Sequence, residues 1–285
     1  MTVCVAALAQ KSKAIVCIAD TAISYGDSIQ WDSDSSKIFE LNPSGTLVLF
    51  AGGEEATSRV LGKVIARADE IGNDIAETRK ILESEYEEAV NELITAKYLT
   101  PRLMTKAEYI KATSLPEINS YIRGIATEVQ NYVADCSLIV CGFDVNGKPF
   151  ILSVDAPGVA IDMTTTGFHA IGSGWEKSIS KMLFLEHKRA HPVERTMYDI
   201  FDAKAFAEMA VGVGFNWDTW VITDDRKAHK VPEKIDLLVE HLYVEHERSP
   251  FDKPEKDDEP LPKNWRSQIS KYCKSIMPSE PPRDK

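Results

Sequence analysis

The chain has 285 residues, 44% of them hydrophobic, which is enough apolar material for a large buried core. Its formal net charge of −11 argues against nucleic acid or an anionic membrane as the main partner, because both carry the same sign of charge. No stretch reaches the roughly 20 apolar residues that a membrane-spanning helix needs. We therefore expect neither a nucleic-acid partner nor a membrane partner.

The first apolar segments of the chain predict β-strands. Residues 2–9 and 14–20 are rich in small and β-branched residues and flank a polar turn, which predicts a hairpin. The first segment lacks the preceding basic region of a secretory signal, which also favours a strand. A second hairpin turns at Asn146 and Gly147. The further expected strands are residues 37–41, 46–50, 136–144, 150–154, 159–163 and 217–223.

Apolar residues at helical spacing predict helices between these strands. The expected helices are residues 56–72, 82–93, 118–132, 172–185 and 203–213. The strands come in consecutive runs, and no phosphate-binding glycine motif follows any of them, which argues against a doubly wound parallel sheet. We expect an α+β fold, a four-layer αββα sandwich of two mainly antiparallel sheets.

The composition of the chain changes near residue 249. Residues 1–248 form the expected main domain, with a helical insert at about 72–133. Residues 249–285 are rich in proline and charge, which predicts a tail with a short helix at 265–276.

The five cysteines are scattered, and no two of them form a CxxC pair, so the sequence indicates neither a zinc motif nor a redox motif. Cys4, Cys17 and Cys141 lie in apolar stretches, as free buried thiols in a reducing compartment do. His241 and Glu245 are four residues apart in an expected helix, where a solvated face is favoured over a metal site. We expect a cytoplasmic protein with no metal and no cofactor.

Thr2 follows the start methionine, and a small second residue is compatible with removal of Met1. Removal would leave Thr2 with a free α-amine next to its hydroxyl. An α-amine ordinarily has a pKa of about 7.7–8.0, close to the pH at which a general base works best. A base and a nucleophile would then lie on one residue.

Other polar and glycine positions fall at the ends of the neighbouring strands. Asp20 ends the second expected strand, Lys37 begins the third, and Gly52 and Gly53 end the fourth. In a fold built from two successive hairpins, these positions and Thr2 could meet near one edge.

Residues 2–61 resemble the proteasome β-subunit group of N-terminal nucleophile hydrolases, which includes the bacterial ATP-dependent proteasome-like peptidase. The shared pattern is an N-terminal threonine, an aspartate closing the second strand, a lysine in a K-[IV]-aromatic context and an AGG turn into a helix. Here the aspartate-to-lysine and lysine-to-glycine separations are 17 and 15 residues. Farther on, residues 169–174 resemble the group's glycine-serine-glycine motif and residues 216–223 its late strand.

The resemblance implies amide hydrolysis through an acyl-enzyme ester on Thr2. Lys37 would lie beside the Thr2 hydroxyl and keep the α-amine neutral, because a nearby positive charge lowers the pKa of an amine. Asp20 would fix Lys37 and balance its charge. The backbone N–H of Gly52 would stabilise the oxyanion, and Ser173 would hydrogen-bond the Thr2 amine or a nearby water.

Substrate and partners also follow from the resemblance. The substrate would be a peptide or a small amide, and Phe50 and Gly53 would lie beside its pocket. Members of the group often form rings, so we expect a homo-oligomer. An ATP-dependent unfoldase partner is implied by analogy alone.

The sequence departs from the pattern of the group shortly before the last strand, and Ser173 allows a second interpretation. Many members of the group carry an aspartate and a serine shortly before the last strand. Residues 213–217 contain neither, so Asn216 or Asp218 would have to substitute. Ser173 and Glu176 also match a capping box, which would give the serine a purely structural role.

Three alternative functions remain open from the sequence. The first is a non-proteolytic amidase that uses the same nucleophile on a small substrate. The second is an inactive scaffold or binding subunit that retains Met1. The third is a generic α/β binding protein with an acidic tail, which is favoured if Asp20 and Lys37 lie far apart.

Overall fold

The computed structural model describes residues 2–25, 29–32, 36–115, 119–210, 212–247 and 264–278. It contains two five-stranded sheets, in which all neighbouring strands are antiparallel. The first sheet has the order β10 (Phe168–Ile171), β1 (Cys4–Ala9), β2 (Ala14–Asp20), β11 (Trp217–Thr223) and β12 (Lys227–Lys230). The second has the order β5 (Ile38–Asn42), β6 (Thr46–Gly52), β7 (Cys136–Phe143), β8 (Pro149–Asp155) and β9 (Val159–Asp162). A separate hairpin of β3 (Ala22–Tyr25) and β4 (Ile29–Asp32) follows β2.

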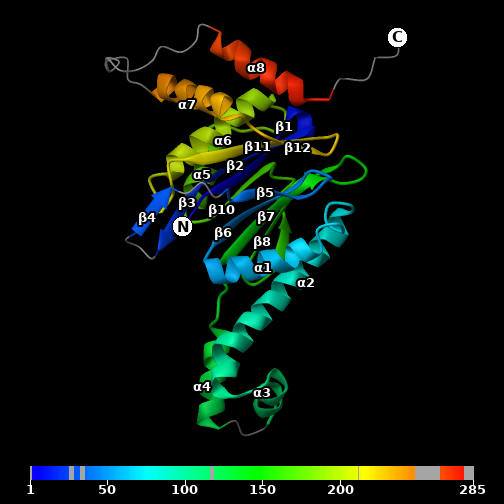
Figure 1. The fold of residues 1–285 in the computed structure, drawn as a ribbon, viewed down its shortest axis with the longest axis vertical. Helices are drawn as coiled ribbons and strands as arrows, with labels where there is room; N and C mark the ends of the chain where they lie inside the picture. The colour runs from blue at the N-terminus through cyan, green and yellow to red at the C-terminus, as the bar shows by residue number, and fades with distance from the viewer. Residues whose placement is uncertain are drawn as a thin grey trace.

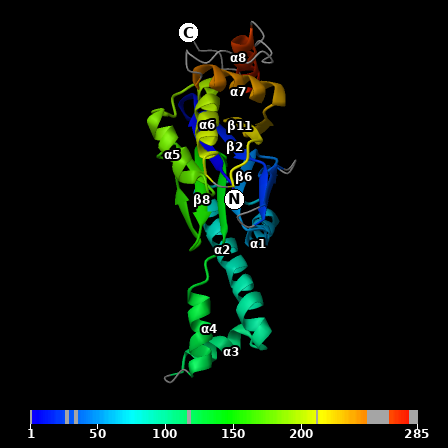
Figure 2. The same ribbon diagram turned by 90° about the vertical axis from the view of Figure 1, so that its left-hand side faces the viewer.

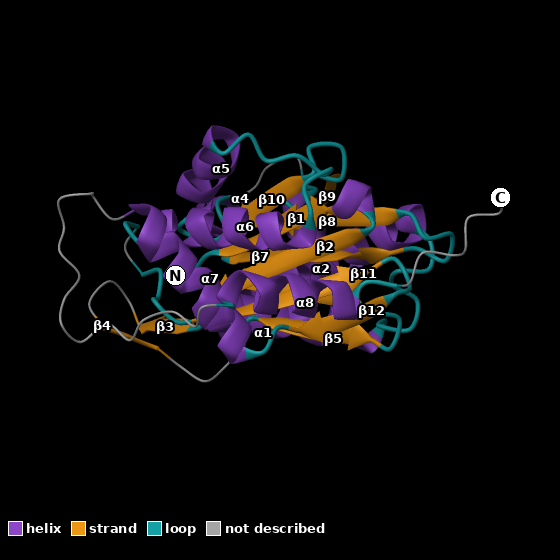
Figure 3. Ribbon diagram, turned by 90° about the horizontal axis from the view of Figure 1, so that it is seen from above, coloured by secondary structure: helices purple, strands orange, loops and turns teal. Residues whose placement is uncertain are grey.

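Helices cover the outer face of each sheet (Figure 1). The first sheet is covered by α5 (Trp175–Phe184), α6 (Val193–Ala207), α7 (Glu233–Glu247) and α8 (Trp265–Ile276). The second is covered by α1 (Glu54–Ala66) and α2 (Ile75–Ile94). Figure 3, seen from above, shows α6 and α8 lying over the strands of the first sheet.

The alternation of side chains along the strands explains the layers, because successive residues of a strand point to opposite faces. Along β1, Val5 packs under the helices of its own sheet, whereas Cys4 and Leu8 face the second sheet. Both faces are apolar, so β1 and β2 are fully buried. The predicted α+β sandwich of two antiparallel sheets is confirmed.

A helical arm extends away from the sandwich (Figures 1 and 2). It consists of the far part of α2, two short helical turns at Thr95–Leu99 and Thr100–Arg102, α3 (Lys106–Thr113) and α4 (Ser120–Gln130). Its small core, centred on Leu99, Ile122 and Ile125, is separate from the cores of the sandwich. The arm corresponds to the expected helical insert, although α3 was not predicted.

Two predicted boundaries differ from the structure. The helix expected at 203–213 is α6, which begins ten residues earlier, at Val193, and ends at Ala207. The helix expected to open at 172–174 begins at Trp175, with Gly174 as its N-cap. A capping box needs a side chain at the N-cap, and this N-cap is a glycine, so the capping-box interpretation of Ser173 and Glu176 is wrong.

The predicted helix at 265–276 is confirmed as α8. Ile269 and Cys273 from this helix are buried in the same core as Val193 and Met197 of α6. This part of the C-terminal region therefore completes the outer layer of the first sheet. Among the described helices, none is long and apolar enough to cross a membrane.

Candidate active site

The start of β1 lies between the ends of two other strands of its sheet. Cys4 is opposite Ala19 of β2 on one side and Ile171 of β10 on the other. Both neighbours are antiparallel, so the residues just before Cys4 lie beside the residues that follow Ala19 and Ile171. This register brings Thr2 next to Asp20 and Ser173. Thr2 is buried, with 3% of its surface exposed.

Asp20 is fully buried and accepts hydrogen bonds from two backbone amides. Its Oδ1 accepts from the Val3 amide at 3.1 Å, and its Oδ2 accepts from the Gly214 amide at 2.7 Å. A carboxylate can be buried when its oxygens are paired in this way. Asp20 therefore fixes the backbone next to Thr2.

Lys37 reaches Thr2 from the second sheet, where it directly precedes β5. Its Nζ donates hydrogen bonds to Thr2 Oγ1, to Asp20 Oδ1 at 3.0 Å and to the carbonyl oxygen of Ala22. An ammonium has three protons, so these three acceptors match its donor capacity. The predicted proximity of Asp20 and Lys37 is confirmed, which removes the support for a generic α/β binding protein.

Ser173 lies on the other side of Thr2. The Thr2 backbone nitrogen donates to Ser173 Oγ at 3.2 Å, and the Ser173 hydroxyl also lies 3.3 Å from the Thr2 carbonyl oxygen. The preceding Gly172 has a φ of +91°, and a Cβ atom there would lie 2.2 Å from the same carbonyl oxygen. A glycine is required at this close approach. Ser173 is solvent-exposed, so the Thr2 nitrogen lies near the protein surface.

The end of β6 passes beside β1. The Phe50 carbonyl oxygen accepts a hydrogen bond from the Cys4 thiol at 3.4 Å, and the Phe50 amide donates to the Lys37 carbonyl oxygen at 3.2 Å. Burial is the main cause that raises the pKa of the Cys4 thiol well above its usual range. Cys4 is therefore a protonated, structural thiol and a poor nucleophile.

Gly52 and Gly53 follow on the same strand end. Gly52 has a φ of +129°, and a Cβ atom there would lie 2.2 Å from the carbonyl oxygen of Asp135. The Gly53 amide donates to that same oxygen at 2.8 Å. The Gly53 amide therefore already donates to a backbone oxygen. Gly52, in contrast, is exposed at the end of β6. The half-buried ring of Phe50 packs against Phe39, with ring centres 6.1 Å apart.

The expected substitutes for the group's aspartate and serine pair do not lie at Thr2. Lys230 pairs with Asp218 at 2.7 Å, and Asn216 is exposed, with its backbone oxygen accepting from the Thr21 amide. The contact that the sequence missed comes from Gly214, whose amide holds Asp20. A backbone donor carries no side-chain signal, so no motif could have indicated it.

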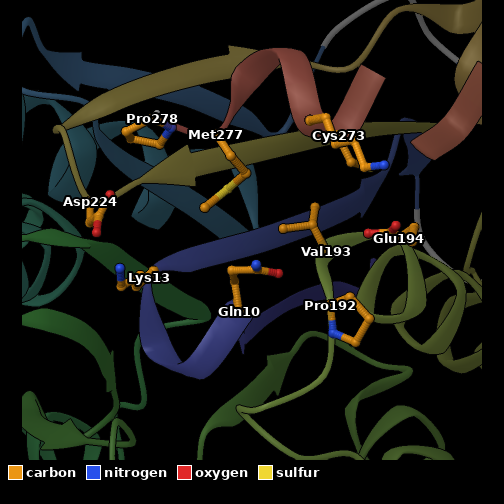
Figure 4. Close-up of a pocket in the computed structure, with 10 residues that line it drawn as sticks. Gln10, Lys13, Pro192, Val193, Glu194, Asp224, Cys273, Met277 and Pro278 are labelled. Carbon is orange, nitrogen blue, oxygen red and sulfur yellow. The ribbon is translucent and has the colours of Figure 1, made fainter. Parts of the chain in front are cut away.

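A pocket of about 400 Å³ lies elsewhere in the molecule (Figure 4). Gln10 and Lys13, from the turn between β1 and β2, line one side, and Cys273 and Met277 line the other. The turn is at the opposite end of β1 from Thr2. This pocket is therefore separate from the candidate active site.

Comparisons with known proteins add a likeness of fold. No protein-family model matches the chain, and no curated protein matches it. Among solved structures, the crystal structure of eukaryotic HslV from Trypanosoma brucei is similar, with 18% sequence identity and a TM-score of 0.47. The similarity covers 78% of this chain and 99% of that one.

Proposed function

We propose that this protein is an N-terminal-threonine hydrolase, a peptidase that cleaves amide bonds after removal of Met1. One observation carries the proposal: Lys37 Nζ donates to both Thr2 Oγ1 and Asp20 Oδ1. A threonine hydroxyl is a weak nucleophile, and a buried ammonium at its oxygen stabilises the negative charge that develops there during attack.

The first half of the reaction forms an ester on Thr2. The freed α-amine accepts the Oγ1 proton while Oγ1 attacks the carbonyl carbon of the amide. The carbonyl oxygen becomes an oxyanion, and the Gly52 amide would donate to it. The C–N bond then breaks, the leaving amine takes a proton from the Thr2 ammonium, and the acyl group remains on Oγ1.

The second half releases the acid. The same α-amine accepts a proton from a water molecule, whose oxygen attacks the ester carbon. The bond between that carbon and Oγ1 breaks, Oγ1 regains a proton, and the carboxylic acid leaves. Ser173 supports this use of the amine, because its Oγ lies 3.2 Å from the Thr2 nitrogen.

Intact mass and covalent labelling test the proposal. The mass of the purified protein should lack the initiator methionine. A peptide epoxyketone should then add once, because this electrophile bonds to both the hydroxyl and the free amine of an N-terminal threonine. Labelling should be lost in Thr2→Ala and kept in Thr2→Ser, which retains a hydroxyl nucleophile.

Thr166→Ala is the matched control, because Thr166 is exposed on the surface, outside the candidate site. It should be labelled like the wild type. Equal labelling of Thr2→Ala and the wild type would reject the proposal. Retention of Met1 would instead favour the inactive scaffold. Hydrolysis of small amides but not of peptides by the enzyme before labelling would identify a non-proteolytic amidase.

The homo-oligomer and the unfoldase partner remain predictions. Light scattering coupled to size-exclusion chromatography would test the first. Stimulation of peptide or protein hydrolysis by an added ATP-dependent unfoldase would test the second.

A further inference from the structure

Three side chains of residue types that can bind metals lie together near the end of β1 opposite Thr2. His187 and His191 lie in the connection between α5 and α6, and Asp199 lies in α6. One ligand atom from each lies within 4.8 Å of the others. The side chains of His187 and Asp199 are fully buried, and that of His191 is 26% exposed.

The hydrogen bond of His187 to β1 fixes which of its nitrogens faces the cluster. Nε2 lies 3.0 Å from the carbonyl oxygen of Leu8, which can only accept, so Nε2 carries a proton. Nδ1 lies 3.0 Å from Asp199 Oδ2. Histidines that bind metals commonly donate their second ring N–H to a carbonyl oxygen in this way.

His191 faces the same carboxylate oxygen. Its Nδ1 lies 3.2 Å from Asp199 Oδ2, so two ring nitrogens converge on one oxygen atom. Two ligand atoms bound to one tetrahedral zinc ion, at about 2.0–2.1 Å each, lie about 3.3 Å from each other. The two nitrogen–oxygen separations, 3.0 and 3.2 Å, are within a few tenths of an ångström of this value. The two imidazole rings are nearly perpendicular, at 88°, so they do not stack against each other.

The surroundings hold the three side chains in place. Arg195 Nε lies 2.7 Å from the other carboxylate oxygen, Oδ1, which leaves Oδ2 directed at the histidines. The β1–β2 turn holds the connection, because the Gln10 amide donates to the His191 carbonyl oxygen at 2.7 Å. The Leu8 carbonyl oxygen, Arg195 and the Gln10 amide therefore supply outer contacts of the kind that orient metal ligands.

We propose that His187 Nδ1, His191 Nδ1 and Asp199 Oδ2 bind one zinc ion. Two imidazoles and one carboxylate are a ligand set that suits Zn²⁺. A water molecule completes the tetrahedron from the solvent side, next to the partly exposed His191. The ion links the α5–α6 connection to α6, and it stabilises the outer layer of the first sheet. Leu8 is six residues along β1 from Thr2, about 20 Å at 3.3 Å per residue, so the zinc site is separate from the candidate active site.

Metal titration of the full chain tests this inference. The protein is stripped with a chelator and titrated with Zn²⁺ alone, and bound metal is counted by mass spectrometry. We expect one high-affinity ion per chain and a rise in Tm. Cobalt(II) in place of zinc should give the intense visible absorption of a tetrahedral site.

His191→Asn removes one ligand from the most exposed position, and it should weaken Zn²⁺ binding by at least about 100-fold, beyond the 10–100-fold that loss of an outer-shell contact costs. His241→Asn is the matched control, because His241 is exposed on α7, and it should bind zinc like the wild type. Equal affinity of His191→Asn and the wild type would overturn the proposal.

A variant that fails to fold does not decide the question, so the wild type supplies a second test. X-ray absorption of its zinc complex should show a four-coordinate ion with two imidazole ligands. An octahedral ion, or no bound ion, would overturn the proposal. Labelling of Thr2 is a different readout and is independent of either result.

Discussion

The Asp20 carboxylate lies 3.0 Å from Lys37 Nζ, and this ion pair joins the two sheets next to Thr2. The aspartate side chain is fully buried and the lysine side chain is 11% exposed. Removing one partner of a buried ion pair leaves an uncompensated charge. The same contact therefore contributes both to the stability of the sandwich and to the geometry of the candidate site.

Lys37→Met should lower the free energy of unfolding by about 3–5 kcal/mol, because Asp20 would keep a buried charge without its partner. It should also abolish epoxyketone labelling, since Thr2 Oγ1 loses its cationic donor. Urea denaturation and labelling of the same preparation measure the two effects.

The double variant Asp20→Asn/Lys37→Met separates these effects. With both charges removed, it should regain much of the lost stability and remain unlabelled. A double variant that is as unstable as the two single changes added together would show that the ion pair is not the source of the loss.

Ser173→Ala should slow labelling of Thr2 by about tenfold or more, because the contact of Ser173 with the Thr2 nitrogen disappears. Stability should change by less than about 1 kcal/mol, the usual cost of a lost N-cap, since Ser173 does not cap α5. The rate of labelling as a function of pH is the measurement. A variant that loses stability but is labelled at the normal rate would favour a structural role.

Gly172→Ala should displace Thr2, because the added Cβ would lie 2.2 Å from the Thr2 carbonyl oxygen and φ is +91°. We expect loss of labelling together with a lower Tm. Gly124→Ala in α4 is the matched control, since nothing lies within 4 Å of the added Cβ. There the helix should gain up to about 1 kcal/mol, and labelling should not change.

Burial, the main cause, raises the pKa of Asp236 in α7 to about 7. The folded protein therefore holds this proton more tightly than the unfolded chain, in which an aspartate has a pKa of about 3.9. The contribution of Asp236 to stability is complete below about pH 4 and is lost as the pH rises to about 7.

Asp236→Asn stays neutral at every pH and should remove this dependence. At about pH 8 the variant should be more stable than the wild type by up to about 4 kcal/mol, and at about pH 4 the two should be similar. Urea denaturation across this range is the measurement. Glu87→Gln, on the exposed face of α2, is the control and should leave the pH dependence unchanged. A parallel pH profile for Asp236→Asn and the wild type would contradict the prediction.

Much of the fold could be predicted from the sequence, because strand alternation and turn composition are local signals. The hairpin of β1 and β2 and the strand β11 have the expected positions. The start of α6 was missed because buried polar residues such as Asp199 and Asp202 interrupt its apolar pattern. Asp199 faces His187 outside the helix and Asp202 pairs with Lys181 of α5, and no local pattern indicates such partners.

Part of the candidate site could likewise be predicted from the sequence, and part could not. Thr2, Asp20 and Lys37 lie at strand ends, so their proximity follows from the order of the hairpins. Gly214 acts through its backbone, and the site of His187 and His191 depends on Asp199 and on Leu8, which is 179 residues from His187. Contacts of this kind exist only once the chain has folded.

The strand order of the first sheet has a consequence for biosynthesis. β1 and β2 emerge before their neighbours β10 and β11, which come more than 140 residues later. The contacts around Thr2 therefore depend on pairings of very high sequence separation, which are slow to form. A growing polypeptide that has not yet reached Gly214 lacks the donor to Asp20 Oδ2. The geometry of the candidate site would accordingly be completed late in translation.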